Sequence, residues 1–328
     1  MAKKRILSGM RPTGKLHLGN YLGALENWIA LQDEYQNYHL VADYHVLTTD
    51  LSTDEIYSNT IEMVTDWLAA GLDPEKSPMF RQSKIKEHTE LFLIFSMLIT
   101  KARLERNPTL KEQVRDLNIE NLVYGHLGYP VLQAADILLY KGEVVPVGED
   151  QLPHIEITRE IARKFNTQYS PDSPVFPEPE GKITSFARLP GLDGQRMSKS
   201  VGNTILLSDG PEIVTQKLRK AVTDPQKLRK NDLGRPEVCL VFTYHKKFNP
   251  QDIPEIEADC RSGVLGCVDC KLRCASKINE ILAPILEKRK TYENDLNKVI
   301  DILHDGESKA GLVAKQTMDE VHQKMTIG

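Results

Sequence analysis

A loop near the start of the chain carries residues that suit phosphate binding. It lies between the first predicted strand and the first predicted helix and contains Gly9, Gly14 and Gly19, which allow a backbone to approach a ligand closely. His17 and Asn20 add side-chain donors beside the helix N-terminus, whose unpaired N–H groups attract phosphate. A plain strand-to-helix turn can have the same glycine content, so this loop alone leaves both interpretations open.

A second loop places two cations among small residues. Residues 194–203, GQRMSKSVGN, contain Arg196 and Lys199. Cations on such a loop suit a polyphosphate whose charge changes during a reaction. Taken alone, such a loop is more often a solvated surface turn.

Together the two loops resemble the paired signatures of class I aminoacyl-tRNA synthetases. HLGN at residues 17–20 resembles the HIGH signature, and RMSKS at residues 196–200 resembles the KMSKS signature. The resemblance implies a Rossmann-like catalytic domain in which both loops bind ATP. The ATP-binding residues that it implies here are Arg11, Pro12, Thr13, Gly19, Asn20, Arg196, Met197, Ser198, Lys199 and Ser200.

Two further segments narrow the resemblance to the tryptophanyl-tRNA synthetase family. They are YPVLQAADILLY at residues 129–140 and VPVGEDQ at residues 145–151, and the similarity runs along essentially the whole chain. In the family, the carboxylate matching Asp136 accepts the indole N–H of tryptophan. The other tryptophan-binding residues that the resemblance implies are Tyr129 and Gln151, which hold the amino group, together with Gln133 and Val147.

Asp136 also stands out on physical grounds, because it lies within an otherwise apolar helix. An unpaired carboxylate there would be costly, so a partner is expected. A structural salt bridge is the alternative to a substrate-binding role.

The family resemblance places further residues on the ATP side. It implies that Gly148, Glu149 and Asp150 line the nucleotide, although Asp150 could instead cap the helix that follows. Lys111 resembles a family lysine that reaches the pyrophosphate. Four positions depart from the common family pattern, with Arg11 in place of Gln, His17 in place of Thr, Gln133 in place of Met and Arg196 in place of Lys.

All five cysteines lie within a short stretch of the C-terminal part. Cys239, Cys260, Cys267 and Cys270 follow the pattern C-x20-C-x6-C-x2-C, and Cys274 is left over. Four thiolates can close a zinc site or hold an iron–sulfur cluster. The pattern resembles a subset of the family that carries a [4Fe-4S] cluster, while Zn²⁺ and free buried thiols remain the alternatives.

Composition limits the class of protein and its partners. The chain of 328 residues has 27% charged and 40% hydrophobic residues, as expected of a soluble globular protein. A net charge of -4 gives no global attraction to nucleic acid, so RNA would need a local basic face. The candidate face consists of Lys217, Arg219, Lys220, Lys227, Arg229 and Lys230, which could also be a solvated surface.

No segment is expected to direct the chain to a membrane. The apolar stretch at residues 91–99 is far shorter than the roughly 20 residues that span a bilayer. The basic N-terminus reaches Gly, Arg and Pro before an apolar core of signal-peptide length can form. A cytoplasmic location is therefore expected.

These candidate residues require a scaffold of alternating strands and helices. Strands are predicted at residues 5–8, 38–42, 78–83 and 144–147, and helices at 21–34, 54–70 and 152–165, which is typical of a parallel α/β sheet. Residues 166–210 lack periodicity and predict a long loop. The remaining predicted helices are at 211–221, 271–290 and 292–325.

We therefore expect a Rossmann-like catalytic domain at residues 1–205 and a mainly helical, anticodon-binding domain at 206–328, whose last helix could pack back on the first domain. The resemblance implies a homodimer that uses ATP, Mg²⁺ and L-tryptophan to form tryptophanyl-adenylate and then charges tRNA(Trp). Catalysis would rest on positioning and charge from His17, Asn20, Lys111, Arg196 and Lys199. The alternatives are a tyrosine-specific paralogue and a non-catalytic RNA-binding or redox-sensing paralogue.

Overall fold

The structure is a computed structural model that describes residues 3–116, 118–183, 189–199 and 201–327. The chain divides into two compact units, each built from separate stretches of sequence. The first unit consists of Met1–Gly14, Glu26–Ser185 and Asp295–Gly328, and the second of Lys15–Leu25 and Phe186–Asn294.

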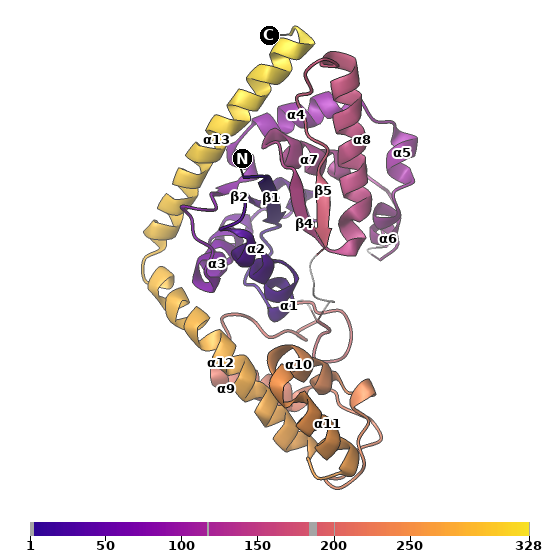
Figure 1. Ribbon diagram of the computed structural model, residues 1–328, viewed down its shortest axis with the longest axis vertical. Helices are drawn as coiled ribbons and strands as arrows, with labels where there is room; N and C mark the ends of the chain where they lie inside the picture. The colour runs from indigo at the N-terminus through magenta and orange to yellow at the C-terminus, as the bar shows by residue number, and fades with distance from the viewer. Residues whose placement is uncertain (1–2, 117, 184–188, 200, 328) are drawn as a thin grey trace. The chain divides into compact units, whose positions relative to one another are not determined.

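The first unit is built on a parallel sheet in the order β3-β2-β1-β4-β5, of which Figure 1 labels β2, β1, β4 and β5. The strands are β1 (Arg5–Met10), β2 (Gln36–Val41), β3 (Met79–Arg81), β4 (Val144–Val147) and β5 (Glu180–Ile183). The strand order reverses between β1 and β4, and ligands of open parallel sheets bind at such a switch point, beyond the carboxyl ends of the strands. The expected Rossmann-like α/β fold is confirmed.

Helices pack around this sheet and bury its apolar residues. The helices of the first unit are α2 (Glu26–Leu31), α3 (Ile56–Ala70), α4 (Glu87–Ser96), α5 (Lys101–Glu105), α6 (Pro108–Asp116), α7 (Tyr124–Leu139), α8 (Leu152–Tyr169) and α13 (Leu296–Met325). Short 3-10 turns follow three strands: η2 (Tyr44–Thr48), η3 (Gln82–Lys84) and η4 (Glu149–Gln151). Helix α7 is buried along most of its length and contributes to the main hydrophobic core.

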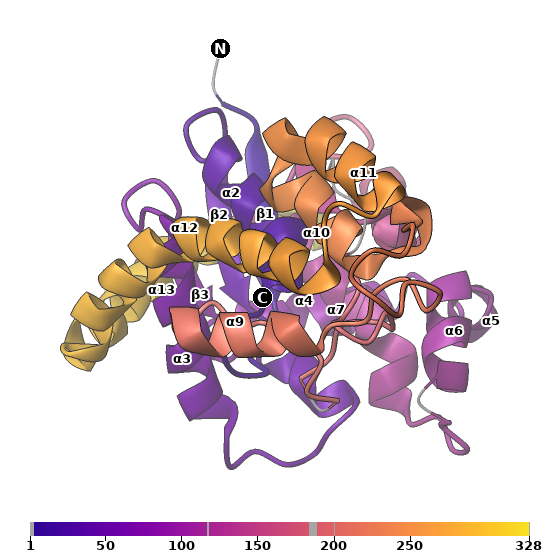
Figure 2. The ribbon, with the colours of Figure 1, turned by 90° about the horizontal axis from the view of Figure 1, so that it is seen from below.

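Helix α13 packs directly against the edge strand β3 and beside α3 (Figure 2). A Cβ atom on Gly306 would lie only 2.0 Å from the Met79 carbonyl oxygen, so glycine alone permits this approach of helix to strand backbone. Arg81 at the end of β3 forms an ion pair with Glu307 at 2.5 Å. The edge of the sheet is thereby covered by a helix.

The second unit is mainly helical. It consists of α1 (Leu18–Asn20), η1 (Tyr21–Leu25), α9 (Pro211–Lys220), η5 (Pro236–Val238), α10 (Leu240–Phe248), η6 (Pro250–Asp252), α11 (Ile253–Ser262) and α12 (Cys267–Glu293). Helices α9 and α12 lie side by side (Figure 2). The Tyr244 hydroxyl on α10 donates a hydrogen bond to the Pro190 carbonyl at 2.7 Å, which fixes the start of the 190–203 loop to this unit.

This division differs from the expected boundary between residues 205 and 206. Residues 16–18 are hydrogen-bonded through their backbone to residues 205–207. The Leu18 N–H donates to the Ile205 carbonyl, and the Leu207 N–H donates to the Leu16 carbonyl. The 190–203 loop thus belongs with the helical unit, while residues 295–328 belong with the sheet. In the described part of the chain, every helix is too short or too polar to cross a membrane.

Candidate active site

One face of α7 carries three of the predicted tryptophan-binding residues. Tyr129, Gln133 and Asp136 follow one another at intervals of four and three residues, which places them on the same side of the helix. Tyr129 and Asp136 are buried, and Gln133 is half-buried. The face begins beside the C-terminal edge of the sheet, because the nearby residue His126 contacts the Thr48 carbonyl through Nδ1 at 2.9 Å.

The Asp136 carboxylate is surrounded by three polar side chains. Its Oδ1 lies 2.7 Å from both Gln82 Nε2 and His88 Nδ1, and its Oδ2 lies 2.9 Å from His45 Nε2. Burial alone would raise the pKa of Asp136, but the hydrogen bonds and charges of His45 and His88 outweigh it and lower the pKa to about 2. We call these four residues the Asp136 cluster.

The donors of the Asp136 cluster leave one acceptor position of the carboxylate that no described residue fills. An ionised carboxylate offers about four acceptor positions, two on each oxygen. Two donors occupy Oδ1, whereas Oδ2 has His45 alone among the described residues. A charged, buried acceptor with one open position can bind an N–H group of a ligand.

The partners of Asp136 were not predicted from the sequence. His45 and Gln82 lie just after β2 and β3, at the sheet edge where ligands of such folds bind, so their positions carried a usable signal. His88 lies within α4, away from the strand ends, and its position in the sequence gave no such signal. The salt bridge considered as an alternative involves histidines, since His45 and His88 form ion pairs with Asp136 when they are protonated, and no Lys or Arg pairs with it among the described residues.

Tyr129 belongs to a second hydrogen-bonded group. Its hydroxyl lies 2.6 Å from His154 Nε2 and is also hydrogen-bonded to Gln113. Burial raises the pKa of Tyr129, against the opposing charge of Arg11 and the bond to Gln113. His154 has a pKa lowered to about 4, mainly by burial, so it is a neutral partner. Gln113 and His154 were both missed by sequence reasoning.

The predicted ATP-side turn follows β4 at the same edge of the sheet. Val147 is the last residue of that strand, and Gly148 is followed by Glu149 and Asp150 in η4. Gln151 ends the turn and donates to Asp150 Oδ2 at 3.1 Å. A Cβ on Gly148 would lie 2.8 Å from Asp150 Oδ1, so the turn is tight.

Lys111 is linked to this turn through its own helix. Thr109, two residues earlier on α6, donates its hydroxyl hydrogen to the Asp150 carbonyl at 2.7 Å. Lys111 itself is exposed. The structure therefore brings the helix of Lys111 to the predicted nucleotide-binding turn.

The segment after β1 presents Arg11 at the same sheet edge. Its guanidinium donates to the Thr49 hydroxyl at 3.2 Å, and its charge reaches Tyr129. Pro12 is buried and Thr13 is exposed. Gly14 has φ of +93, which glycine adopts readily, and the chain turns there toward the second unit's sequence.

In the second unit, His17 and Asn20 form a reciprocal cap at the start of α1. The Asn20 N–H donates to His17 Nδ1, and the His17 N–H donates to Asn20 Oδ1. This leaves the imidazole edge that carries Nε2 for other contacts. Burial, together with the charge of Lys199, lowers the pKa of His17 to about 4.

Residues 196–199 of the RMSKS segment lie beside this cap within the same unit. A Cβ on Gly19 would lie 3.2 Å from Met197 Sδ, and Lys199 Nζ donates to the Lys15 carbonyl at 3.1 Å. The two signature segments are thus brought together although they are far apart in sequence. Arg196 is exposed, and the predicted site residue Ser200 lies outside the described residues.

Asn203 fixes the shape of that loop. Its Oδ1 accepts the Ser198 N–H at 2.8 Å, and its Nδ2 donates to the Arg196 carbonyl at 3.0 Å and to Asp193 Oδ1 at 2.9 Å. Gly191 is needed opposite it, since a Cβ there would lie 2.3 Å from Asn203 Nδ2. Asn203 is a positioning residue that sequence reasoning did not single out.

The four cysteines of the predicted metal site gather in the second unit. Burial raises the pKa of Cys270 to about 12, and the charges of Cys239, Cys260 and Cys267 add to this effect. His245 Nε2 lies 3.4 Å from Cys270 Sγ. No three His, Cys, Asp or Glu side chains of the described residues are arranged to hold a single metal ion.

The basic run is only partly available to a ligand. Lys217 pairs with Asp209 at 2.6 Å, and Lys227 is buried and donates to the Asp232 carbonyl. The exposed members without a carboxylate partner among the described residues are Arg219, Lys220 and Arg229. Of the six predicted cations, these three are therefore the ones available to bind a phosphate.

Known proteins resemble this chain over nearly its whole length. Residues 2–283 match the family model described as tRNA synthetases class I (W and Y). The chain is 43% identical to the tryptophan–tRNA ligase of Aquifex aeolicus, with 98% of this chain and 100% of the relative covered. It is 48% identical to the tryptophan–tRNA ligase of Thermotoga maritima, with 98% of this chain and 99% of the relative covered.

The fold also matches solved structures. A crystal structure of tryptophanyl-tRNA synthetase from Campylobacter jejuni, complexed with ADP and tryptophan, superposes with a TM-score of 0.87. It shares 31% sequence identity and covers 98% of this chain and 100% of that chain.

Proposed function

Because this chain belongs to the class I tryptophanyl-tRNA synthetases and is a tryptophan–tRNA ligase, we propose that Asp136 is the residue by which it recognises tryptophan. The observation that carries the proposal is the Asp136 cluster, which keeps a buried carboxylate ionised and leaves one acceptor position open. The indole N–H would occupy that position. Tyr129 and Gln151 would hold the amino group, and Gln133 and Val147 would line the remainder of the site.

Replacement of Asp136 by asparagine tests this role. The amide offers its neighbours only one oxygen and no charge, and loss of a hydrogen bond to a charged group costs about 1.5 to 3 kcal/mol, or roughly 10- to 150-fold in affinity. Isothermal titration of Asp136→Asn should show this loss for tryptophan with ATP binding nearly unchanged. Equal losses for both substrates would indicate damage to the fold instead.

We further propose that the two signature segments act on ATP. The tryptophan carboxylate attacks the α-phosphate, the bond to the β-phosphate oxygen breaks and pyrophosphate leaves, after which a ribose hydroxyl at the tRNA 3′ end takes the acyl group and AMP leaves. No protein nucleophile is needed, so the chain's groups position and neutralise charge. ATP would enter as its Mg²⁺ complex, because Mg²⁺ is held largely by substrate phosphates.

The residues assigned to ATP have distinct roles in this scheme. His17 and Asn20 would meet the phosphates beside α1, and Arg196, Lys199 and Lys111 would stabilise the departing pyrophosphate. The turn of Gly148, Glu149 and Asp150 and the segment of Arg11, Pro12 and Thr13 would hold the nucleoside, with Gly19, Met197, Ser198 and Ser200 as further members of the ATP site.

We propose that Cys239, Cys260, Cys267 and Cys270 hold a [4Fe-4S] cluster. The mutual effects on the Cys270 pKa indicate that the four thiols lie close together, and four neighbouring cysteines are the ligand set that a [4Fe-4S] cluster takes. A bound cluster would cross-link the loop and helices that carry the four thiolates. Because the chain's nucleotide motifs lie elsewhere in the sequence, amino-acid activation should not use it.

Metal analysis and an ultraviolet-visible spectrum of anaerobically prepared protein test this assignment. Cys270→Ser should abolish iron content and the sulfur-to-iron absorption band. Cys274→Ser is the matched control and should retain both. Dependence on Cys274 with Cys239 dispensable would replace the proposed ligand set.

For tRNA(Trp), we propose that the second unit contacts the backbone through Arg219, Lys220 and Arg229. Each neutralised phosphate steepens the salt dependence of binding, so the triple replacement by alanine should reduce the slope of log affinity against log salt by about 2 to 3. Lys247→Ala, another cation of the same unit, is the control. An unchanged slope would remove this face from the tRNA site.

We also propose that the enzyme is a cytoplasmic homodimer. Leu93 and Met97 at the end of α4 and Val123 and Tyr124 at the start of α7 are exposed, Met97 to 75%. Exposed apolar residues on two helices that contact each other suit packing against a second copy of the chain. Light scattering should show that Met97→Glu shifts the mass to a monomer, whereas Leu312→Glu, at an exposed position on α13, should not.

A further inference from the structure

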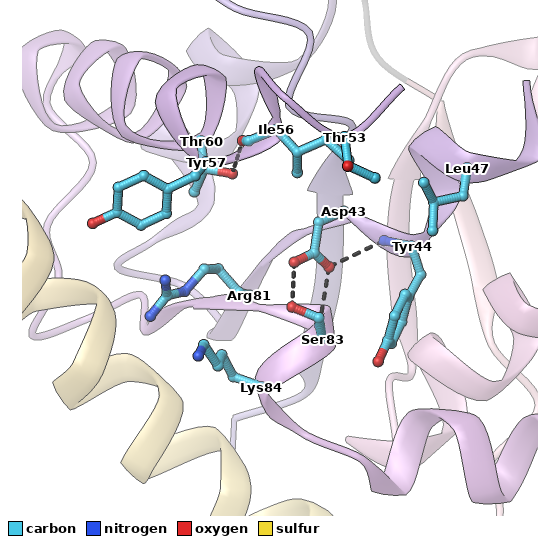
Figure 3. A pocket seen from close by; sticks show the side chains of 10 residues that line it. All are labelled: Asp43, Tyr44, Leu47, Thr53, Ile56, Tyr57, Thr60, Arg81, Ser83 and Lys84. Atoms are coloured by element: carbon cyan, nitrogen blue, oxygen red, sulfur yellow. Dashed lines mark hydrogen bonds between the residues drawn. The ribbon is translucent and has the colours of Figure 1, made fainter. Parts of the chain in front are cut away.

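A cavity of about 340 Å³ lies at the carboxyl ends of β2 and β3 (Figure 3). Its wall includes Asp43, Thr60 and Ser83, whose side-chain oxygens are hydrogen-bonded within the protein. A ligand site needs polar groups that converge on the ligand. The informative feature here is therefore the set of hydrogen bonds that joins Asp43 to Tyr44 and Ser83 in the wall of the cavity, which we call the brace.

We infer that Asp43 is a positioning residue for tryptophan binding. Its Oδ1 accepts the Tyr44 N–H at 3.0 Å and the Ser83 N–H at 2.9 Å. Its Oδ2 accepts the Ser83 hydroxyl hydrogen. Figure 3 shows the Asp43 carboxylate between Tyr44 and Ser83, and Asp43 is buried. One side chain thus ties the segment after β2 to the segment after β3.

The brace lies where the strand ladder has ended. Backbone pairing of β2 with β3 extends only to Val41 and Arg81. Beyond these residues the two segments diverge into η2 and η3, and regular strand pairing no longer fixes their spacing. The Asp43 carboxylate replaces the missing ladder bonds with side-chain bonds to Ser83.

A residue adjacent to the brace on each segment belongs to the Asp136 cluster. Tyr44 precedes His45, whose Nε2 contacts Asp136 Oδ2, and Ser83 follows Gln82, whose Nε2 contacts Asp136 Oδ1. A shift between the segments would move these two groups relative to each other. Asp43 therefore sets the separation of the groups that orient the Asp136 carboxylate, without touching Asp136 itself.

This inference rests on the proposed role of Asp136 as the tryptophan acceptor. If the brace fails, Asp136 should remain buried but lose its fixed orientation. Misplacement by about 1 Å can cost up to about 100-fold, so an intermediate effect confined to tryptophan is expected. A purely structural brace would lower stability without a preference between the two substrates.

The test compares Asp43→Ala, Asp43→Asn and Ser83→Ala in the full chain by tryptophan-dependent pyrophosphate exchange. Asp43→Ala should raise the KM for tryptophan about 10-fold and leave the KM for ATP within about 2-fold. Asp43→Asn keeps one acceptor oxygen and should fall between Asp43→Ala and the parent. Should Asp43→Ala not fold, Ser83→Ala carries the test, with a rise of about threefold in the tryptophan KM alone.

Asn166→Ala is the matched control. Asn166 also braces backbone, since its Oδ1 accepts the Val175 and Phe176 N–H groups, but it lies 12 residues along α8 from His154, or roughly 18 Å. It should lower the unfolding temperature without changing the tryptophan KM. An unchanged tryptophan KM in Asp43→Ala, or an equal rise in Asn166→Ala, would overturn the inference.

Asp136→Asn separates the two proposals. If it spares the tryptophan KM, the proposed role of Asp136 is wrong. If it raises that KM while folded Asp43→Ala does not, only the positioning role of Asp43 is wrong.

Discussion

His17 and Asn20 cap each other at the start of α1, where His17 Nδ1 accepts the Asn20 N–H at 3.2 Å and Asn20 Oδ1 accepts the His17 N–H at 3.1 Å. Since Nδ1 is an acceptor, the proton of the neutral ring resides on Nε2. The pKa of His17 is lowered to about 4 by burial and by the charge of Lys199. His17 is therefore a neutral hydrogen-bond donor at physiological pH.

This protonation state predicts how activity depends on pH. The ratio of kcat/KM for ATP between the parent enzyme and His17→Asn should stay constant from pH 6 to pH 8, because His17 does not titrate in that range. Pyrophosphate exchange at each pH measures the ratio. An inflection in the ratio near pH 6.5 would contradict the neutral assignment.

Lys199 should matter for the chemical step more than for binding. Loss of one preorganised charge lowers rates on the order of 100- to 1000-fold. Lys199→Ala should show this loss in single-turnover adenylate formation, with tryptophan affinity retained. The opposite pattern, weaker tryptophan binding and an intact chemical step, would remove the RMSKS segment from the transition state.

The parallel sheet was predictable because its central strands are short apolar runs between helical patterns. Strand β5 was not, since Glu180–Ile183 is largely exposed and lies within a segment that lacks periodicity. Asp136 could be found from its helix, but its partners could not. His45, Gln82 and His88 lie 91, 54 and 48 residues away, and only the fold brings them together.

His39 should make the protein sensitive to acid. The ring is buried between Trp28 and Trp67, and burial lowers its pKa to about 3. The unfolded chain therefore binds a proton below about pH 6.5 that the folded chain does not, and stability falls by about 1.4 kcal/mol per pH unit as pH decreases.

His39→Phe should remove this penalty while filling the space between the tryptophans. Between pH 7 and pH 5 the variant should lose about 2 kcal/mol less of its free energy of unfolding than the parent. Urea unfolding at both pH values measures this, with His304→Gln, an exposed histidine, as the control. An equal acid loss in parent and His39→Phe would show that His39 is not the cause.

Gly306 should be irreplaceable where α13 meets β3. Gly306→Ala places a methyl group against the Met79 carbonyl and should cost about 1 to 3 kcal/mol through overpacking. Gly311→Ala on the same helix meets nothing within 4 Å and should stabilise by up to about 1 kcal/mol through helix propensity. Thermal unfolding that moves both variants in the same direction would refute this packing argument.

The central claim is that the chain activates tryptophan through the Asp136 carboxylate. Pyrophosphate exchange into ATP, measured with each of the twenty amino acids for the parent enzyme and for Asp136→Asn, tests it most directly. We predict exchange that depends on tryptophan in the parent and falls about 10- to 150-fold in kcat/KM for tryptophan in Asp136→Asn. Exchange that depends on tyrosine in the parent, or tryptophan-dependent exchange that survives unchanged in Asp136→Asn, would contradict the account.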